Sequence, residues 1–202
     1  ACHLKMTTGG TLSAVLDALI ESDFIYCYRP FDAAPYEKLY RLVDPFCLMW
    51  LYWIEKEGVT DTMFWQHNVN SSVIYRWGGM AFEEVCMMHI SQIKKALHIG
   101  GVQTEHSSFT LRGTNDHDGT QCDLIFSRAD RVVNLCEMKY CQEEYAIDKT
   151  YDKVLRNRMA IVRNQLKKSQ TLQLTLVTTF GVKPNMYSGI VQSEVVLDDL
   201  FE

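Results

Sequence analysis

The sequence contains no CxxC pair, and none of its six histidines lies at ligand spacing from a cysteine. Structural zinc sites are built from such closely spaced ligands, so we expect no zinc centre. The seven cysteines are odd in number, and we expect most of them to be reduced thiols that pack as small apolar side chains. Reduced thiols are typical of the cytoplasm, which is where we place the protein.

Long apolar segments are also lacking, and we expect no signal peptide. The most apolar run, FCLMWLYWI at residues 46–54, is much shorter than the roughly 20 residues that a membrane-spanning helix needs. The net charge of −5 does not by itself indicate a nucleic-acid-binding protein. We expect the opening ACHLKMTTGG to be the edge of a longer chain. The 202 residues suffice for one domain or two small ones with a sizeable core.

The first part of the chain, residues 1–57, predicts a helix, a hairpin and a connecting helix. Apolar residues recur at helical spacing in 11–22, and strand-like runs follow at 24–31 and 38–43. An aspartate–proline pair at 44–45 is a good start for the second helix. A helix followed by a two-stranded wing is typical of a partial winged helix-turn-helix, and equally of a generic helix and hairpin. Both interpretations stay open.

The rest of the chain predicts a linker and an α/β (α+β) domain with a mixed sheet. Residues 58–76 are mixed and polar and form the expected linker, and the domain covers 77–202. Its pattern is helix, three strands, helix and strand, followed by a final strand. The expected bounds, in the same order, are 81–99, 108–113, 120–128, 131–140, 148–168, 172–180 and 191–201.

A carboxylate lies on the expected inner face of the helix at 81–99. Glu83 precedes Cys86 by three residues and Ile90 by seven, so it falls on their apolar stripe. Its neighbour Glu84 projects elsewhere, and we expect it to be solvated.

Charged residues also interrupt the strand RVVNLCEMKY at 131–140. Side chains alternate across a strand, so Glu137 and Lys139 share one face and lie about 7 Å apart. If 120–128 and 131–140 pair as a hairpin, Asp123 lies near the level of Glu137. Buried charges are costly unless they are paired or used.

Glu83, Asp123 and Glu137 would then converge with Lys139. Like charges repel one another, and a hard divalent cation such as Mg²⁺ (or Mn²⁺) removes that conflict through its oxygen ligands. Such an ion generates hydroxide and stabilises charge at phosphorus, while Lys139 would position or activate the attacking water. The alternative is that Glu137 and Lys139 neutralise each other at a sheet edge, with Asp123 exposed.

The element order and these residues resemble the PD-(D/E)XK nuclease superfamily. Its core is helix, three strands, helix and strand, with an acid in the second strand and (D/E)-x-K in the third. Asp123 and the EMK run from Glu137 to Lys139 match this motif, and Glu83 matches the helix glutamate of many members. Cys122 stands where the signature has proline. The resemblance implies a restriction-endonuclease-like fold, metal binding by the three acids, and catalysis by these acids and Lys139.

Longer stretches resemble the C-terminal region of bacterial AAA+-type, STAND-like ATPases, in which a P-loop domain and a winged helix precede a PD-(D/E)XK-like domain. The stretches cover nearly the whole chain: GGTLSAVLDALIESDFI, LYRLVDPFCLMWLYWI, WGGMAFEEVCMMHISQIKKAL, GTQCDLIFSRADRVVNLCEMKY and VVLDDLF. The sequence has no GxxxxGK[ST], so the ATPase module is absent from this chain and we expect no ATP hydrolysis.

Residues 149–168 carry seven basic side chains and one acidic side chain, although the chain as a whole is acidic. Five of the basic residues recur at helical spacing and form one basic stripe: Lys149, Lys153, Arg156, Arg163 and Lys167. The stripe is either a face that follows DNA phosphates beside the site or an ordinary solvated helix face.

The sequence therefore supports three hypotheses. The first is a Mg²⁺-dependent nuclease that hydrolyses phosphodiester bonds of DNA as the C-terminal part of an ATPase-type protein. The second is a catalytically inactive DNA-binding or regulatory module of such a protein. The third is a protein-interaction domain, which includes a homo-oligomer, with residues 46–54 as its contact surface.

Overall fold

The structure is a computed structural model, and it describes residues 9–31, 34, 36–55, 61–111 and 120–202. The predicted loop at 113–119 and the opening residues 1–8 lie outside the described residues. The chain divides into two compact units: Ala1–Arg29 with Ala33–Ser71, and Pro30–Asp32 with Ser72–Glu202. The boundary at Ser71 and Ser72 falls within the stretch that we expect to be a linker. In the described residues, no helix is both long enough and apolar enough to cross a membrane.

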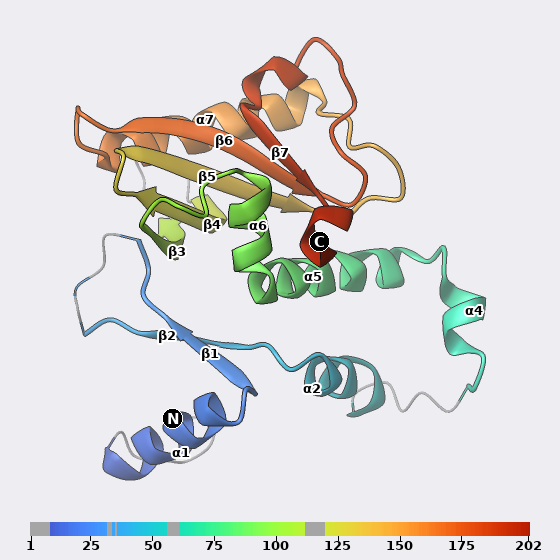
Figure 1. The fold of residues 1–202 in the computed structure, drawn as a ribbon. Coiled ribbons are helices and arrows are strands. Elements are labelled where there is room, and N and C mark those ends of the chain that lie inside the picture. Colours follow the sequence, from blue (N-terminus) through green and yellow to red (C-terminus); the bar gives the residue numbers. More distant parts are fainter. Residues whose placement is uncertain (1–8, 32–33, 35, 56–60, 112–119) are drawn as a thin grey trace, which may run out of the picture. The chain divides into compact units, whose positions relative to one another are not determined.

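The first unit contains a two-stranded antiparallel sheet and several helical segments (Figure 1). Its strands pair from Ile25 opposite Leu42 to Tyr28 opposite Leu39, which confirms the predicted hairpin. The elements in chain order are α1 (Gly10–Glu21), β1 (Ile25–Tyr28), β2 (Leu39–Leu42), α2 (Pro45–Met49), the π-helical turn η1 (Trp50–Ile54) and α4 (Phe64–Asn68).

The connecting helix begins as predicted, because a side-chain oxygen of Asp44 accepts a hydrogen bond from the Cys47 backbone N–H at 2.6 Å. Its aromatic residues differ in their burial. Trp53 is buried, whereas the residues Phe46 and Trp50 are 62% and 45% exposed. The aromatic run is therefore only partly a core element.

The second unit is built around a five-stranded mixed sheet in the order β3-β4-β5-β6-β7. The β3–β4 and β4–β5 pairs are antiparallel, and the β5–β6 and β6–β7 pairs are parallel. An α/β fold with a mixed sheet is thus confirmed. The elements are α5 (Ser72–Met88), α6 (Ile90–Ala96), β3 (Thr104–Leu111), β4 (Thr120–Arg128), β5 (Val132–Lys139), α7 (Lys149–Gln165), β6 (Thr171–Thr178), η2 (Ser188–Ile190), β7 (Ser193–Val196) and η3 (Asp198–Phe201).

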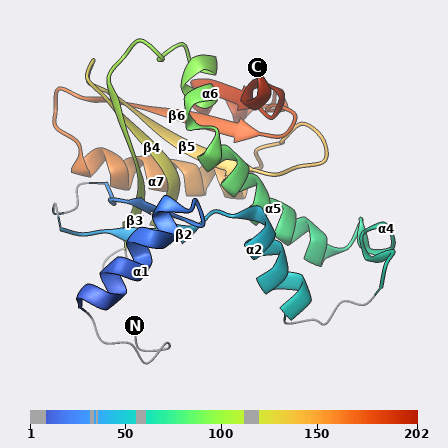
Figure 2. The ribbon, with the colours of Figure 1, turned by 60° about the horizontal axis from the view of Figure 1, so that its bottom comes forward.

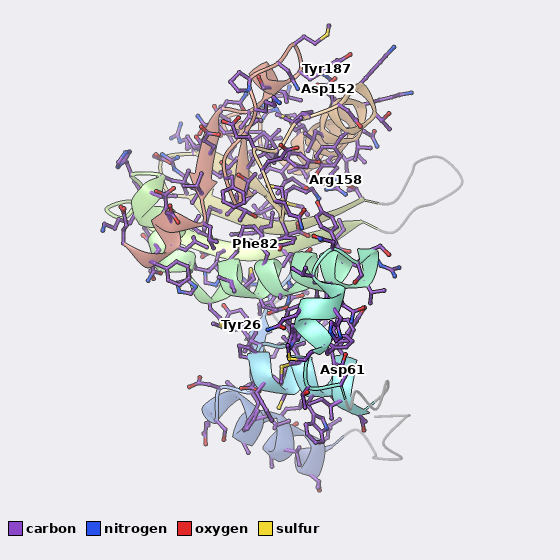
Figure 3. All side chains as sticks on the ribbon, turned by 90° about the vertical axis from the view of Figure 1, so that its right-hand side faces the viewer. Tyr26, Asp61, Phe82, Asp152, Arg158 and Tyr187 are labelled. Atoms are coloured by element: carbon purple, nitrogen blue, oxygen red, sulfur yellow. The ribbon has the colours of Figure 1, made fainter. Side chains whose placement is uncertain are left out.

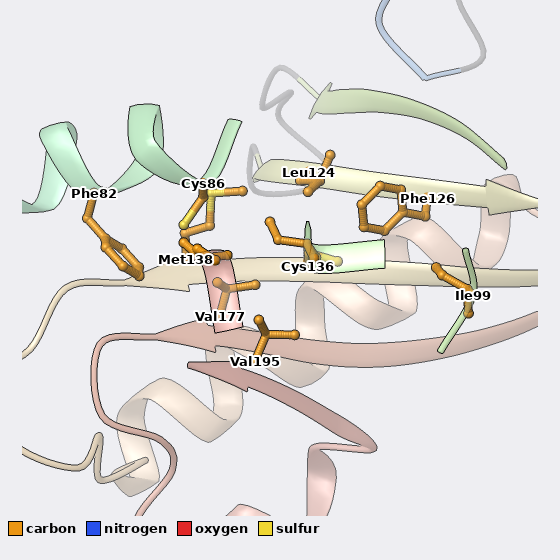
Figure 4. Close-up of a cluster of buried hydrophobic side chains, with 11 residues drawn as sticks. Phe82, Cys86, Ile99, Leu124, Phe126, Cys136, Met138, Val177 and Val195 are labelled. Carbon is orange, nitrogen blue, oxygen red and sulfur yellow. The ribbon is translucent and has the colours of Figure 1, made fainter. Parts of the chain in front are cut away.

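Helices cover both faces of this sheet (Figure 2). On one face, α5 and α6 pack on a buried cluster that Figure 4 shows, and its members include Phe82, Cys86, Ile93, Leu124, Phe126, Cys136 and Met138. On the other face, α7 packs on a second cluster that includes Ile125, Val133, Leu135, Leu155, Val162, Leu174 and Leu176. Residues of β5 thus alternate between the two layers, as the sequence predicts, and the face of Val133 and Leu135 is the face of Glu137.

The predicted helix at 81–99 is in fact two helices that meet at His89, and the first begins at Ser72. The second ends in a Schellman motif, in which the backbone N–H groups of His98 and Ile99 donate to the carbonyls of Lys95 and Lys94, both at 2.9 Å. His98 adopts a φ of 56° there, so the left-handed position falls on a histidine although two glycines follow at 100–101.

Candidate metal centre

Asp123 and Glu137 are brought together by the antiparallel pairing of β4 and β5. In this pairing Leu124 lies opposite Cys136. The regular pairing ends at that pair, one residue short of Asp123 and Glu137. Oδ2 of Asp123 also accepts a long hydrogen bond of 3.5 Å from the backbone N–H of Met138, the residue after Glu137.

An irregularity in β4 lies at the same place. On one side of it Ser107 pairs with Ile125, and on the other side Phe109 pairs with Cys122. One residue of β3 therefore faces two residues of β4, and Asp123 is one of these two. Such a bulge changes the direction of the side chains in the strand that carries it, and bulges are frequent beside functional sites.

Glu137 is fully buried, and its two carboxylate oxygens have different surroundings. Oε2 accepts hydrogen bonds from Nη1 of Arg158 at 2.5 Å and from the Tyr151 hydroxyl at 3.1 Å. Oε1 has no hydrogen-bond partner among the residues that the structure describes. Leaving a buried acceptor unsatisfied costs about 1–3 kcal/mol, and more for a charged group, so a partner for Oε1 would stabilise the site.

The charges around Glu137 offset the effect of burial on its pKa only in part. Burial raises the pKa of Glu137 above the ordinary glutamate value, the Arg158 charge counters this effect, and the Asp123 charge reinforces it. For Arg158, burial alone would lower the pKa, but the Glu137 carboxylate outweighs burial and raises it. The guanidinium therefore stays charged, and Asp123 lies within electrostatic reach of both partners.

Lys139 ends β5 on the same face as Glu137. Its Nζ lies 4.0 Å from Oε2 of Glu137 and 5.0 Å from the centroid of the Tyr151 ring. The side chain is 29% exposed. The ammonium group is thus held by a carboxylate and an aromatic face while it remains open to solvent on another side.

Tyr151 and Arg158 are absent from the site that the sequence predicts. Both lie on α7, and Arg158 can be followed in Figure 3. They are seven residues apart and share a helical face with the fully buried Leu155 and Val162. Arg158 therefore interrupts an apolar stripe. A basic residue on the apolar face of a predicted helix indicates a buried acidic partner, and this pattern could have identified Arg158 from the sequence.

Glu83 is half-buried in α5, and the prediction that Glu84 is solvated is wrong, because Glu84 is buried. Positions two apart on a helix point about 200° apart, so burial of both Phe82 and Glu84 means that α5 is covered on two sides. Beyond the effect of burial itself, the charges of Glu83 and Asp123 both raise the pKa of the Cys86 thiol. The two carboxylates therefore act on one buried group from different elements.

The described residues contain no group of three or more histidine, cysteine, aspartate or glutamate side chains placed to hold a metal ion. Glu83, Asp123 and Glu137 thus do not form a ready-made three-carboxylate centre. Mg²⁺ typically requires only one or two carboxylates, because waters and substrate oxygens complete its shell. Asp123 and Glu137, with the Oε1 atom described above, fit this smaller set.

The five residues of the basic stripe are all exposed. The helix ends at Gln165 and not at 168, so Lys167 lies beyond it. Arg156 donates to Asp152 one turn earlier at 2.9 Å, and Arg163 donates to a backbone carbonyl at 2.5 Å. Exposed contacts of this kind are weak, so both guanidinium groups remain accessible to an external anion.

No protein-family model matches the chain, and no curated protein matches it. Among solved structures, a protein of unknown function, AF1548, is similar at a TM-score of 0.36 with 12% sequence identity. The likeness covers 57% of this chain and 64% of that chain, so less than two thirds of that protein is spanned. At this distance neither a shared fold nor a shared activity follows.

Proposed function

We propose that the second unit is a divalent-metal-dependent nuclease domain with a restriction-endonuclease-like core, which hydrolyses phosphodiester bonds of DNA. The observation that carries the proposal is the surroundings of Glu137 on β5. Asp123 of β4 accepts a hydrogen bond from the residue after Glu137, Glu137 is buried with one oxygen unpartnered among the described residues, and Lys139 follows on the same face. The element order α5, α6, β3, β4, β5, α7 and β6 supports the same interpretation.

In this proposal Asp123 and Glu137 would hold Mg²⁺ or Mn²⁺ together with waters. Glu83 lies on α5, which packs on the other face of the sheet from Glu137, so its assistance stays a prediction. The bound ion supplies an activated water at neutral pH and stabilises negative charge on the phosphate. Lys139, partly exposed beside Glu137, orients the attacking water or holds a phosphate oxygen. The basic stripe holds the DNA backbone, which makes binding weaken as salt rises.

The first unit fits the same proposal. A helix followed by the β1–β2 hairpin is the arrangement expected of a partial winged helix, and α2 with η1 then serves as the connecting segment. We infer that the whole chain is the C-terminal part of an ATPase-type protein. This inference rests on the sequence resemblance alone.

Cleavage of supercoiled plasmid DNA in the presence of Mg²⁺ or Mn²⁺ tests the proposal. Asp123→Ala and Lys139→Ala should abolish nicking. Asp130→Ala, which removes an exposed carboxylate in the β4–β5 turn, is the matched control and should cleave like the wild type. Equal cleavage by all four proteins would mean that a contaminating nuclease is responsible.

A second candidate function is a DNA-binding or regulatory module without turnover. The ion pair between Arg158 and Glu137 favours it, because a cation already neutralises the buried carboxylate. In that case calorimetry would detect no uptake of Mg²⁺, while salt-sensitive DNA binding would be lost when the charges of Lys149, Lys153 and Arg156 are reversed.

A further inference from the structure

The two carboxylate oxygens of Glu137 differ in their hydrogen bonds. Arg158 and Tyr151 both donate to Oε2, while Oε1 is buried without a hydrogen-bond partner in the described part of the chain. We propose that Tyr151 and Arg158 are positioning residues, which hold Oε2 and thereby direct Oε1 toward the divalent cation. This inference rests on the metal site of the proposed function and names the residues that set its affinity.

The asymmetry is significant because a carboxylate can exchange its oxygens by rotating about its last torsion. Two donors on one oxygen, one of them charged, oppose that rotation. Carboxylates that bind metals are generally held by such outer hydrogen bonds, and their loss typically lowers metal affinity about 10–100-fold. Mg²⁺ is demanding in this respect, because it requires near-ideal octahedral geometry.

Tyr151 is itself held in place from several sides. The Asp148 side chain caps α7 by accepting from the Tyr151 backbone N–H at 2.7 Å. The ring of Tyr145 packs edge-on against the Tyr151 ring with centroids 5.8 Å apart, and Lys139 lies over its face. A hydroxyl on a ring so constrained is a donor with a fixed direction.

Arg158 is anchored in a similar way. It lies between Leu155 and Val162 on the inner face of α7, and both of these side chains are fully buried. The opposite role for Arg158 would be competition, in which the guanidinium occupies the place of the cation and must leave before the ion binds. The two roles differ in sign: positioning predicts that loss of the guanidinium fork weakens metal binding, and competition predicts that it strengthens it.

Calorimetric titration of the whole chain with Mn²⁺ separates these roles without any measurement of cleavage. We expect Tyr151→Phe and Arg158→Lys to weaken Mn²⁺ binding by roughly tenfold or more. Arg158→Lys keeps the positive charge, so its effect reports the geometry of the donors. Tyr145→Phe removes a hydroxyl from the neighbouring ring, which is not one of the Glu137 donors described here, and should bind Mn²⁺ like the wild type.

Unchanged affinity in Tyr151→Phe and Arg158→Lys, or tighter binding in Arg158→Lys, would overturn the positioning role. Glu137→Gln separates this failure from failure of the metal site itself. If the wild type takes up no Mn²⁺, or if Glu137→Gln binds it equally well, the proposed function falls and the inference falls with it. Circular dichroism checks that each variant is folded, and if one of the two positioning variants does not fold, the other decides.

Discussion

Replacement of Arg158 by methionine should destabilise the second unit by about 3 kcal/mol at neutral pH. The change keeps an unbranched apolar stem but removes the cation from a carboxylate that is fully buried. Removing one partner of a buried ion pair costs about 3–5 kcal/mol, because the remaining charge is left uncompensated. The lower end of this range applies, since the Arg158 side chain is 23% exposed.

The loss should also depend on pH. Burial raises the pKa of Glu137 above its ordinary value of 4.5. A carboxyl group with a raised pKa in the folded state contributes stability that is fully present below the unfolded value and is lost as pH rises through the folded value. Without Arg158 the folded value rises further, so Arg158→Met should cost more at pH 8 than at pH 5. Adding Glu137→Gln should restore most of the loss.

Hydrogen–deuterium exchange of the β5 and β6 amides is the appropriate assay. These strands are central and buried, so their amides exchange through opening of the whole second unit, whatever happens in the first unit. A loss of about 3 kcal/mol corresponds to roughly 100-fold faster exchange. An acceleration below about fivefold, or one that is equal at both pH values, would refute the assignment of Arg158 as the counter-charge of Glu137.

Three further predictions concern stability alone. Gly78→Ala should lower the melting temperature, because its Cβ would lie 2.7 Å from a Tyr140 ring atom. The neighbouring Gly79 has open space around it, so Gly79→Ala should raise the melting temperature, and equal shifts in the two variants would contradict the close packing at Gly78. His98→Gly should stabilise the protein by about 1 kcal/mol in urea unfolding, since it relieves a left-handed backbone position, and a loss would argue against the Schellman motif. Burial lowers the pKa of His106, so this histidine contributes stability above its unfolded value of 6.5 that is lost as pH falls toward the folded value. His106→Gln should therefore flatten the decline in stability below pH 6.5, and an unchanged decline would contradict this account.

The β4–β5 hairpin could be predicted because two simple regularities determine it. Alternation along 131–140 sets the faces of Glu137 and Lys139, and a short turn fixes which residues of the two strands meet. Asp123 follows from the same register. The bulge that contains Asp123 could not be predicted, since it arises from pairing with β3, a contact that local patterns do not encode.

The partners of Glu137 were harder to find from the sequence. A helical stripe predicts which residues face inward, and Tyr151 is on that stripe, but the pattern does not say that its hydroxyl meets a carboxylate. Arg158 is one basic residue among many in 149–168, and composition hides its inward position. The prediction that Glu84 is solvated was wrong for a related reason. It assumed that only one face of the helix is covered, whereas α5 is covered on two faces.

The parallel pairing of β5 with β6 sets Lys139 opposite Thr178, so both strands end at the same edge of the sheet, beside Glu137. The segments that leave this edge, 140–148 and 179–187, meet each other: Tyr145 N–H donates to Gly181 O at 2.8 Å, and Lys183 N–H donates to Tyr145 O at 3.0 Å. Connections of this kind can change in length and sequence without disturbing the sheet. Here the two segments are hydrogen-bonded to each other, so a redesign of the surroundings of Glu137 would have to change both segments at once.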